Sequence, residues 1–112
     1  MRDPKERLLD MLEAIERIER YAARGRVAFE ADELVQTWIV HHIQIIGEAA
    51  AKLGPEVRER HPEIPWPEVV AMRNVLVHDY FGVDLEEVWR VVERDLPILK
   101  RAVEAALTGW EE

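Results

Sequence analysis

Residues 32–53 carry apolar side chains around most of the circumference of a predicted helix, and this segment limits the folds open to the chain. Its large apolar residues are Leu34, Val35, Trp38, Ile39, Val40, Ile43, Ile45 and Ile46. Asp32 is a typical capping residue at its start, and Gly54-Pro55 ends it. At 1.5 Å per residue the helix spans about 33 Å. Such a helix needs cover on several sides, so we expect it at the centre of a domain or in a subunit interface.

The rest of the chain also has helical spacing, and no segment has the alternation of a strand. Helices are predicted over residues 4–23, over a short stretch at 55–61, from Pro67 to about His78, and from Asp84 through Ala106. Short links join them. We therefore predict an all-α fold, an up-and-down four-helix bundle with a short extra helix, in one domain over residues 1–112.

The last predicted helix has an apolar seam at alternating steps of four and three residues, which is typical of packing along a neighbouring helix. The seam consists of Leu85, Trp89, Val92, Leu96, Leu99, Val103 and Ala106. Pro97 lies within it and removes one backbone hydrogen bond, so we expect a kink there.

The composition excludes several classes of protein. The chain has 15 Lys and Arg against 23 Asp and Glu, a formal net charge of −8. This excludes a globally basic nucleic-acid binder but leaves room for a local basic cleft. Without Cys, the chain has no disulfide, thiol nucleophile or Cys-type zinc site. No apolar run reaches the roughly 18–20 residues that cross a bilayer, and no signal-peptide core is found, so we expect a cytoplasmic protein.

Four polar residues interrupt the apolar helix and form one stripe: Thr37, His41, Gln44 and Glu48. The stripe either forms the floor of a cleft or faces solvent. Glu48 is the strongest candidate, because an acid near Arg73 would orient the guanidinium, and His41 is a second cleft residue. No His-x3-His or His-Glu-x2-His spacing occurs, so we predict no metal site.

The segment Met72–Phe81 combines residues suited to phosphate chemistry. Arg73 provides a planar, permanently charged fork, and His78 gives or takes a proton near neutral pH. Together they suffice for metal-free phosphodiester cleavage. On an ideal helix the two residues are about 140° apart, so they converge only where the helix end unwinds or a partner chain contributes. The spacing alone equally fits a helix cap or salt bridge, with Asn74 capping and Asp79 paired with Arg73.

Arg73, His78 and Tyr80 form an Arg-x4-His-x-Tyr motif, and other short motifs accompany it along the chain. These are Ile46-Gly-Glu-Ala-Ala50, His61-Pro-Glu-Ile-Pro-Trp66, Phe81-Gly-Val-Asp84, Val88-Trp89 and Asp95-Leu-Pro97. In this order they resemble the HepT-like toxins, the DUF86 family of the HEPN superfamily. The resemblance covers roughly residues 6–106.

The resemblance implies a HEPN-like helical homodimer whose active cleft lies between two copies of the motif helix. It implies a ribonuclease that needs no metal or other cofactor and in which the RNA's own 2′-hydroxyl attacks the phosphodiester. His78 would be the general acid or base, Arg73 would steady the phosphorane, and Asn74 would be a polar helper. Glu48, Asp79 and His41 are the candidates for supporting this cleft.

The resemblance also implies regulation by a partner. Tyr80 matches the tyrosine that an MntA-type minimal nucleotidyltransferase antitoxin modifies with AMP, in a type VII toxin–antitoxin module. The expected substrate is tRNA or mRNA, and no membrane partner is expected. One alternative is a non-catalytic substrate-binding or regulatory subunit of a nucleotidyltransferase, and another is a purely structural helical dimer.

Basic and aromatic side chains have two interpretations each. Two basic groups either hold an RNA backbone or lie on solvated faces: Arg90, Arg94 and Arg101 in one, and Arg58, Arg60 and His61 in the other. The aromatic residues Tyr21, Phe29, Trp66 and Trp89 are expected in the core or an interface, not as base-stacking platforms.

Overall fold

The computed structural model describes the backbone of residues 3–75 and 84–110, and the side chains of the same residues except 74 and 75. The elements, in chain order, are α1 (Pro4–Ala22), α2 (Arg26–Ala31), α3 (Glu33–Ala51), α4 (Pro55–Arg60), α5 (Trp66–Val75), α6 (Leu85–Arg90), the π-helical segment η1 (Val91–Asp95) and α7 (Leu96–Thr108). Every element in these two ranges is helical, which confirms the all-α prediction.

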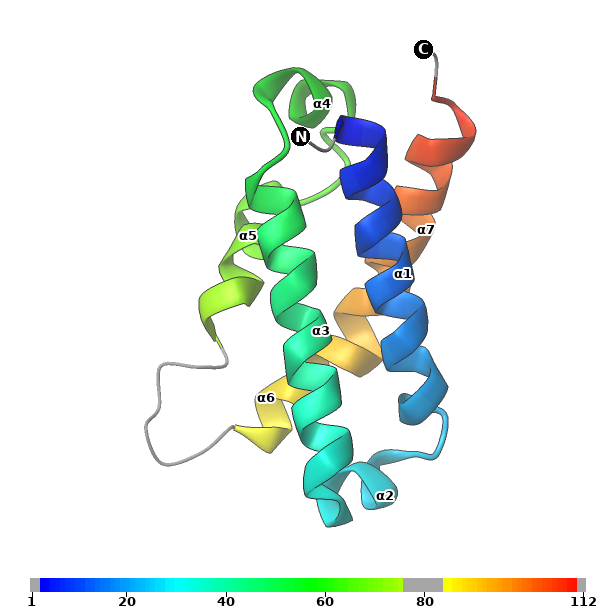
Figure 1. The fold of residues 1–112 in the computed structure, drawn as a ribbon, viewed down its shortest axis with the longest axis vertical. Coiled ribbons are helices and arrows are strands. Elements are labelled where there is room, and N and C mark those ends of the chain that lie inside the picture. Colours follow the sequence, from blue (N-terminus) through cyan, green and yellow to red (C-terminus); the bar gives the residue numbers. More distant parts are fainter. Residues whose placement is uncertain (1–2, 76–83, 111–112) are drawn as a thin grey trace.

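The apolar helix α3 lies at the centre of the bundle, as its circumference predicts. It packs against α1 and α5, and α7 packs against α1 (Figure 1). The long helices run alternately down and up in that view, with α6, η1 and α7 forming the last limb. Ile39, Ile43 and Ile46 of α3 are completely buried in the core. Among the described residues, no helix is long and apolar enough to cross a membrane.

The predicted helix starts are confirmed by their caps. The carboxylate of Asp3 accepts a hydrogen bond from the Glu6 amide at 2.9 Å, and that of Asp32 accepts one from the Leu34 amide at 2.9 Å. Asp84 caps α6 in the same way. Each side chain satisfies an amide that has no partner within its own helix, so these aspartates fix where the helices begin.

The sequence patterns missed helix α2. It follows Gly25, whose φ of +94° lies in the region that favours glycine, and it has no side-chain cap. Its anchor is Phe29, which is 1% exposed and has its ring centroid 5.3 Å from that of Trp89. Only one of the six residues of α2 is buried, so its sequence shows no helical periodicity. The contact between Phe29 and Trp89, which the sequence does not show, holds this helix in place.

The aromatic side chains lie where the sequence analysis expects them. Phe29, Trp66 and Trp89 are buried in the core. Tyr21 is partly buried against Trp38, with ring centroids 5.4 Å apart in an edge-on contact.

The last limb is irregular just before Pro97, because the π-helical segment η1 ends two residues before the proline. The Leu96 amide donates to the carbonyl of Val91, five residues back. This wider turn shifts the predicted seam: Val91 is buried, whereas Val92 is only partly buried. A regular helix would place residues four apart on one face, but a π-turn places residues five apart there.

Two polar contacts fasten α1 to the helices beside it. The Trp38 indole on α3 donates to the carbonyl of Arg17 at 3.1 Å. The Lys100 ammonium on α7 donates to the Glu19 carboxylate at 2.8 Å, and this hydrogen bond raises the pKa of Lys100.

His42 is a buried ionisable residue in the α1–α3 contact, with 3% of its surface exposed. Its Nδ1 donates to the Trp38 carbonyl at 2.7 Å, and its ring lies 4.3 Å from the Trp38 ring. Burial lowers the pKa of His42 below the ordinary 6.5, and His41 and Arg17 act in the same direction, whereas the hydrogen bond to Trp38 opposes it. The fold therefore favours the neutral ring.

We expect His42 to make the protein less stable in mild acid. The unfolded chain takes up the proton near the ordinary pKa, so the contribution of His42 is complete above about pH 6.5 and is lost as the pH falls below that value. In His42→Asn, which keeps a neutral donor, the free energy of unfolding should fall less between pH 7.5 and pH 5.5. Urea titrations at both pH values measure this difference.

The control is His41→Gln, because His41 is exposed and next in sequence. This variant should keep most of the pH dependence of the wild type. An unchanged pH dependence in His42→Asn would contradict the assignment.

Candidate functional site

Arg73 lies in the last turn of α5, where its guanidinium reaches across to α3. Its NH1 atom is 3.6 Å from Oε1 of Glu48, and both side chains are partly exposed. The position near a helix C-terminus also suits a cation. The structure therefore brings together the two residues that the sequence analysis linked.

Gly47 makes this arrangement possible because it lets the backbones of α3 and α5 touch. A Cβ atom on Gly47 would lie 2.5 Å from the Arg73 amide nitrogen, 2.8 Å from its Cβ and 3.0 Å from its Cα. Real Cβ atoms do not approach backbone so closely. Arg73 is thus fixed directly over Gly47, with its head beside the next residue of α3, Glu48.

The polar stripe of α3 borders a hollow beside α1 of about 330 Å³. The lining residues are Arg7, Asp10, His41, Gln44, Ile45, Glu48 and Ala49. Three of the four stripe residues therefore share one hollow, and the fourth, Thr37, instead donates its hydroxyl to the carbonyl of Glu33 at 3.0 Å. Three residues of the stripe thus line a hollow, and one lies on the helix surface.

The contribution of Arg7 and Asp10 was missed by the sequence analysis. On α1 they resemble an ordinary wet face, and only the packing of α1 on α3 places them next to His41 and Glu48. The hollow therefore combines one cation, two carboxylates and an imidazole, which suits contacts to a polar ligand but includes few positive charges.

The remaining motif residues cannot be placed. His78, Asp79 and Tyr80 lie outside the described residues. Asn74 belongs to α5 by its backbone, and its side chain lies outside the described part. Within residues 3–75 and 84–110, no group of three His, Asp or Glu side chains could hold a metal ion.

Arg58, one of the basic residues with two interpretations, has a structural role. Its NH2 atom donates to the carbonyls of Ala50 at 2.9 Å and Ala51 at 3.3 Å, which closes the C-terminus of α3. The indole of Trp66 donates to the carbonyls of Arg58 and His61, which fixes the connector before α5. The NH2 atom of Arg58 is therefore used within the fold, which favours a structural role for this residue over an RNA contact.

Two other basic side chains have acidic partners on the surface. Arg90 is paired closely with Glu87, and Nδ1 of His61 lies 3.5 Å from Glu63. Exposed pairs of this kind contribute little stability, so they do not by themselves exclude contact with RNA.

Comparison with known proteins gives a consistent result. The family described as Ribonuclease HepT-like matches residues 11–106. A protein of Thermococcus cleftensis named "Probable ribonuclease HepT" is 40% identical over 102 residues, which cover 88% of this chain and 91% of that protein. A "Putative RNase" of Caldanaerobacter subterraneus subsp. tengcongensis is 34% identical, covering 96% of each chain. No solved structure gives a significant match.

One further relative is longer. A Methanocaldococcus jannaschii protein, named as a gamma-glutamylcyclotransferase and putative RNase, is 41% identical over 91% of this chain. The matched part is 46% of that protein. The similarity therefore concerns a unit of about 100 residues that also occurs within a larger chain.

Gly47→Ala should disrupt the site and the fold together. The added methyl group would meet the Arg73 backbone, so α3 and α5 must separate, and we expect a loss of about 1–3 kcal/mol in the free energy of unfolding. The matched control is Gly54→Ala, where a Cβ atom meets nothing within 4 Å. Chemical denaturation of both variants measures the difference, and equal stabilities would refute the close approach.

Proposed function

This chain belongs to the ribonuclease HepT-like family, and on that premise we propose that it is a toxin that cleaves RNA without a metal ion. The observation that carries the proposal is Arg73, the first residue of the Arg-x4-His-x-Tyr motif, held beside Glu48 at the α3–α5 crossing. A guanidinium in a fixed position can bind a phosphate through two parallel hydrogen bonds.

The proposed reaction is an internal transfer within the RNA. The 2′-hydroxyl loses its proton and attacks the adjacent phosphorus, the bond to the 5′-oxygen breaks, and that oxygen takes up a proton. The products are a 2′,3′-cyclic phosphate and a free 5′-hydroxyl. His78 acts as general acid or base, and Arg73 binds the non-bridging oxygens, where negative charge grows in the transition state.

Glu48 acts in this scheme as a positioning residue. Its carboxylate holds one side of the Arg73 guanidinium, so the fork keeps a defined direction before the substrate arrives. His41 borders the same hollow as Glu48, and Asn74 follows Arg73 in the motif. We propose His41, Asn74 and Asp79 as supporting polar groups around the bound phosphate.

The proposed assembly is a homodimer with the motif helices facing each other. On a helix Arg73 and His78 point about 140° apart, so a second copy offers a way for one protomer's arginine to meet the other's histidine. Two arginines in one cleft would also provide the local positive charge that a chain of net charge −8 needs to hold tRNA or mRNA.

RNA cleavage by the wild type should persist in EDTA and leave a 2′,3′-cyclic phosphate. His78→Ala should lose roughly 10²–10⁴-fold in rate, the usual contribution of general acid–base catalysis. Arg73→Lys should also fail, because a point charge cannot reproduce the bidentate fork. Gel assays with end-labelled RNA and mass analysis of the products measure these effects.

The control for this test is Arg26→Lys, at an exposed arginine of α2 that belongs neither to the motif nor to the two basic groups, and it should cleave normally. Full activity in His78→Ala, or abolition by EDTA, would refute the mechanism. A wild type that binds RNA without cutting it would instead support the alternative, a non-catalytic subunit of a nucleotidyltransferase.

We further propose that Tyr80 is the regulatory residue, modified with AMP by an MntA-type nucleotidyltransferase. The tyrosine oxygen would attack the α-phosphorus of ATP, releasing pyrophosphate and leaving a phosphodiester two residues from His78. That added phosphate would compete for Arg73, and the nucleotide would occupy space needed by RNA.

Tyr80→Phe should therefore remain folded and cleave RNA, but incubation with the nucleotidyltransferase and ATP should no longer silence it. Intact mass spectrometry should show added AMP on the wild type and none on the variant. Tyr21→Phe is the control, because Tyr21 is the only other tyrosine, and it should be modified like the wild type. Equal AMP addition to Tyr80→Phe would place the switch elsewhere.

A further inference from the structure

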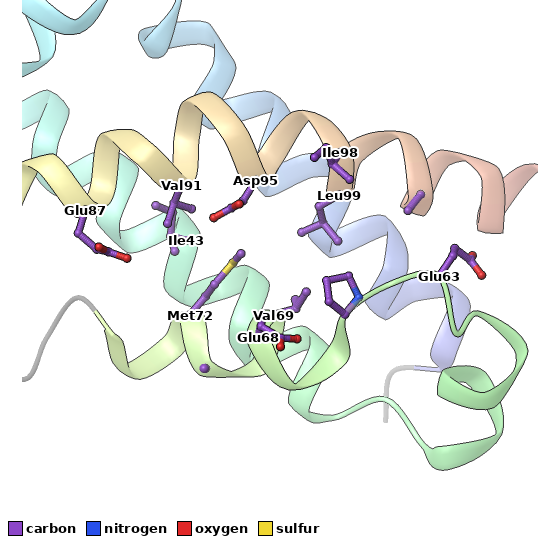
Figure 2. Close-up of a pocket in the computed structure, with 13 residues that line it drawn as sticks. Ile43, Glu63, Glu68, Val69, Met72, Glu87, Val91, Asp95, Ile98 and Leu99 are labelled. Atoms are coloured by element: carbon purple, nitrogen blue, oxygen red, sulfur yellow. The ribbon is translucent and has the colours of Figure 1, made fainter.

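A second cavity, which neither Glu48 nor Arg73 lines, has a different chemistry. It has a volume of about 410 Å³ and lies between α5 and the limb formed by α6, η1 and α7 (Figure 2). Its lining residues are Ile43, Glu63, Pro65, Glu68, Val69, Ala71, Met72, Glu87, Val91, Asp95, Ile98, Leu99 and Ala102. We call it the α5–α7 groove.

The floor of the α5–α7 groove is apolar. Ile43 of the central helix lies at its base, with Val69 and Met72 from α5 on one side and Val91 and Leu99 on the other. At the lip, Ile98 is 60% exposed, so an apolar side chain extends the floor to the edge of the groove.

The rim of the groove carries charge of one sign. All four of its ionisable lining residues are acidic. Figure 2 shows Glu87 and Asp95 on the η1 side, Glu68 on the α5 side, and Glu63 at the far end. Nδ1 of His61 lies 3.5 Å from Glu63, and Arg90 is paired with Glu87. Glu68 and Asp95 form no ion pair with any described residue.

We propose that the α5–α7 groove binds an amphipathic helix of a partner protein, with apolar side chains on one face and lysines or arginines along both edges. A groove between two helices suits a third helix, whose residues at i, i+3, i+4 and i+7 would fill the apolar floor. The flanking cations would meet Glu68 on one side and Asp95 on the other, so the charge pattern fixes the sign of the partner.

The same rim argues against RNA as the occupant. Four carboxylates repel a phosphate backbone, whereas Arg73 lies over α3 and does not line this groove. The inference is therefore independent of the proposed ribonuclease activity, since the two sites use different residues of α5.

The test uses a fluorescent synthetic helix of about 18 residues, with leucines at i, i+3, i+4 and i+7 and lysines on both flanks. The wild type should bind this peptide and should not bind the same peptide with glutamates in place of lysines. The double variant Glu68→Lys/Asp95→Lys should weaken binding by roughly tenfold or more, as measured by fluorescence anisotropy. Ile98→Asp should also weaken it, although it adds a favourable charge, because it removes an apolar contact at the lip.

Matched controls separate the groove from the overall negative charge. Glu59→Lys/Glu104→Lys changes the net charge equally at exposed positions that do not line the groove, and should bind like the wild type. Leu34→Asp is the control for Ile98→Asp, since Leu34 is 82% exposed and also does not line it. Circular dichroism verifies the fold of each variant.

Three results would overturn the proposal: no binding of the basic peptide, equal binding by the two double variants, or equal binding by Ile98→Asp and the wild type. Sedimentation of the wild type and of Glu68→Lys/Asp95→Lys tests the other occupant. If the wild type self-associates through this groove, the double variant alone becomes monomeric, and the partner helix is then wrong. RNA cleavage should be equal in both double variants, so failure here leaves the ribonuclease proposal intact.

Discussion

The contact between Gly47 and Arg73 is the constraint on which the site depends. Here the backbones of α3 and α5 approach more closely than they could if residue 47 had a Cβ atom. The residue of α5 at this contact is Arg73, which carries the guanidinium. The sequence Gly47-Glu48 then has two linked tasks, because the glycine admits the Arg73 backbone and the glutamate receives its guanidinium. Packing and electrostatics are thus set by neighbouring residues on one helix, and a shift of α5 would change both. The position of Arg73 is therefore set by the packing of α5 on α3.

Much of the fold follows from the sequence because its signals are local. The caps at Asp3, Asp32 and Asp84 and the apolar circumference of α3 each act within one helix, and the structure agrees with them. Two features required information from outside the segment. Helix α2 is held by the contact of Phe29 with Trp89, which are 60 positions apart, and η1 changes the register of the last helix without any change in its heptad-like pattern.

The candidate site was predictable in its residue types but not in its surroundings. The pairing of Glu48 with Arg73 follows from charge and motif position. The structure places NH1 of Arg73 at 3.6 Å from Oε1 of Glu48. Arg58 shows the opposite case: the sequence offers a surface cation, yet the structure uses it to close the end of α3. Charge pattern alone cannot distinguish these outcomes, because whether an arginine meets a carbonyl, a carboxylate or solvent depends on a neighbouring helix. Arg7 and Asp10 likewise line the hollow only because α1 packs on α3.

Helix α5 separates two surfaces of different chemistry, and this division suits a protein that handles an anionic substrate despite its own negative charge. The cation Arg73 lies against α3, while Val69 and Met72 line the α5–α7 groove. Glu68 and Asp95 on its rim form no ion pair within the described part of the chain. Adjacent residues on a helix point about 100° apart, so Met72 can line the groove while Arg73, the next residue, lies against α3. The acidic rim of the groove repels a phosphate backbone, whereas the Arg73 guanidinium attracts one. The negative charge of the chain is therefore compatible with the proposed function, because the charges are divided between two faces of α5.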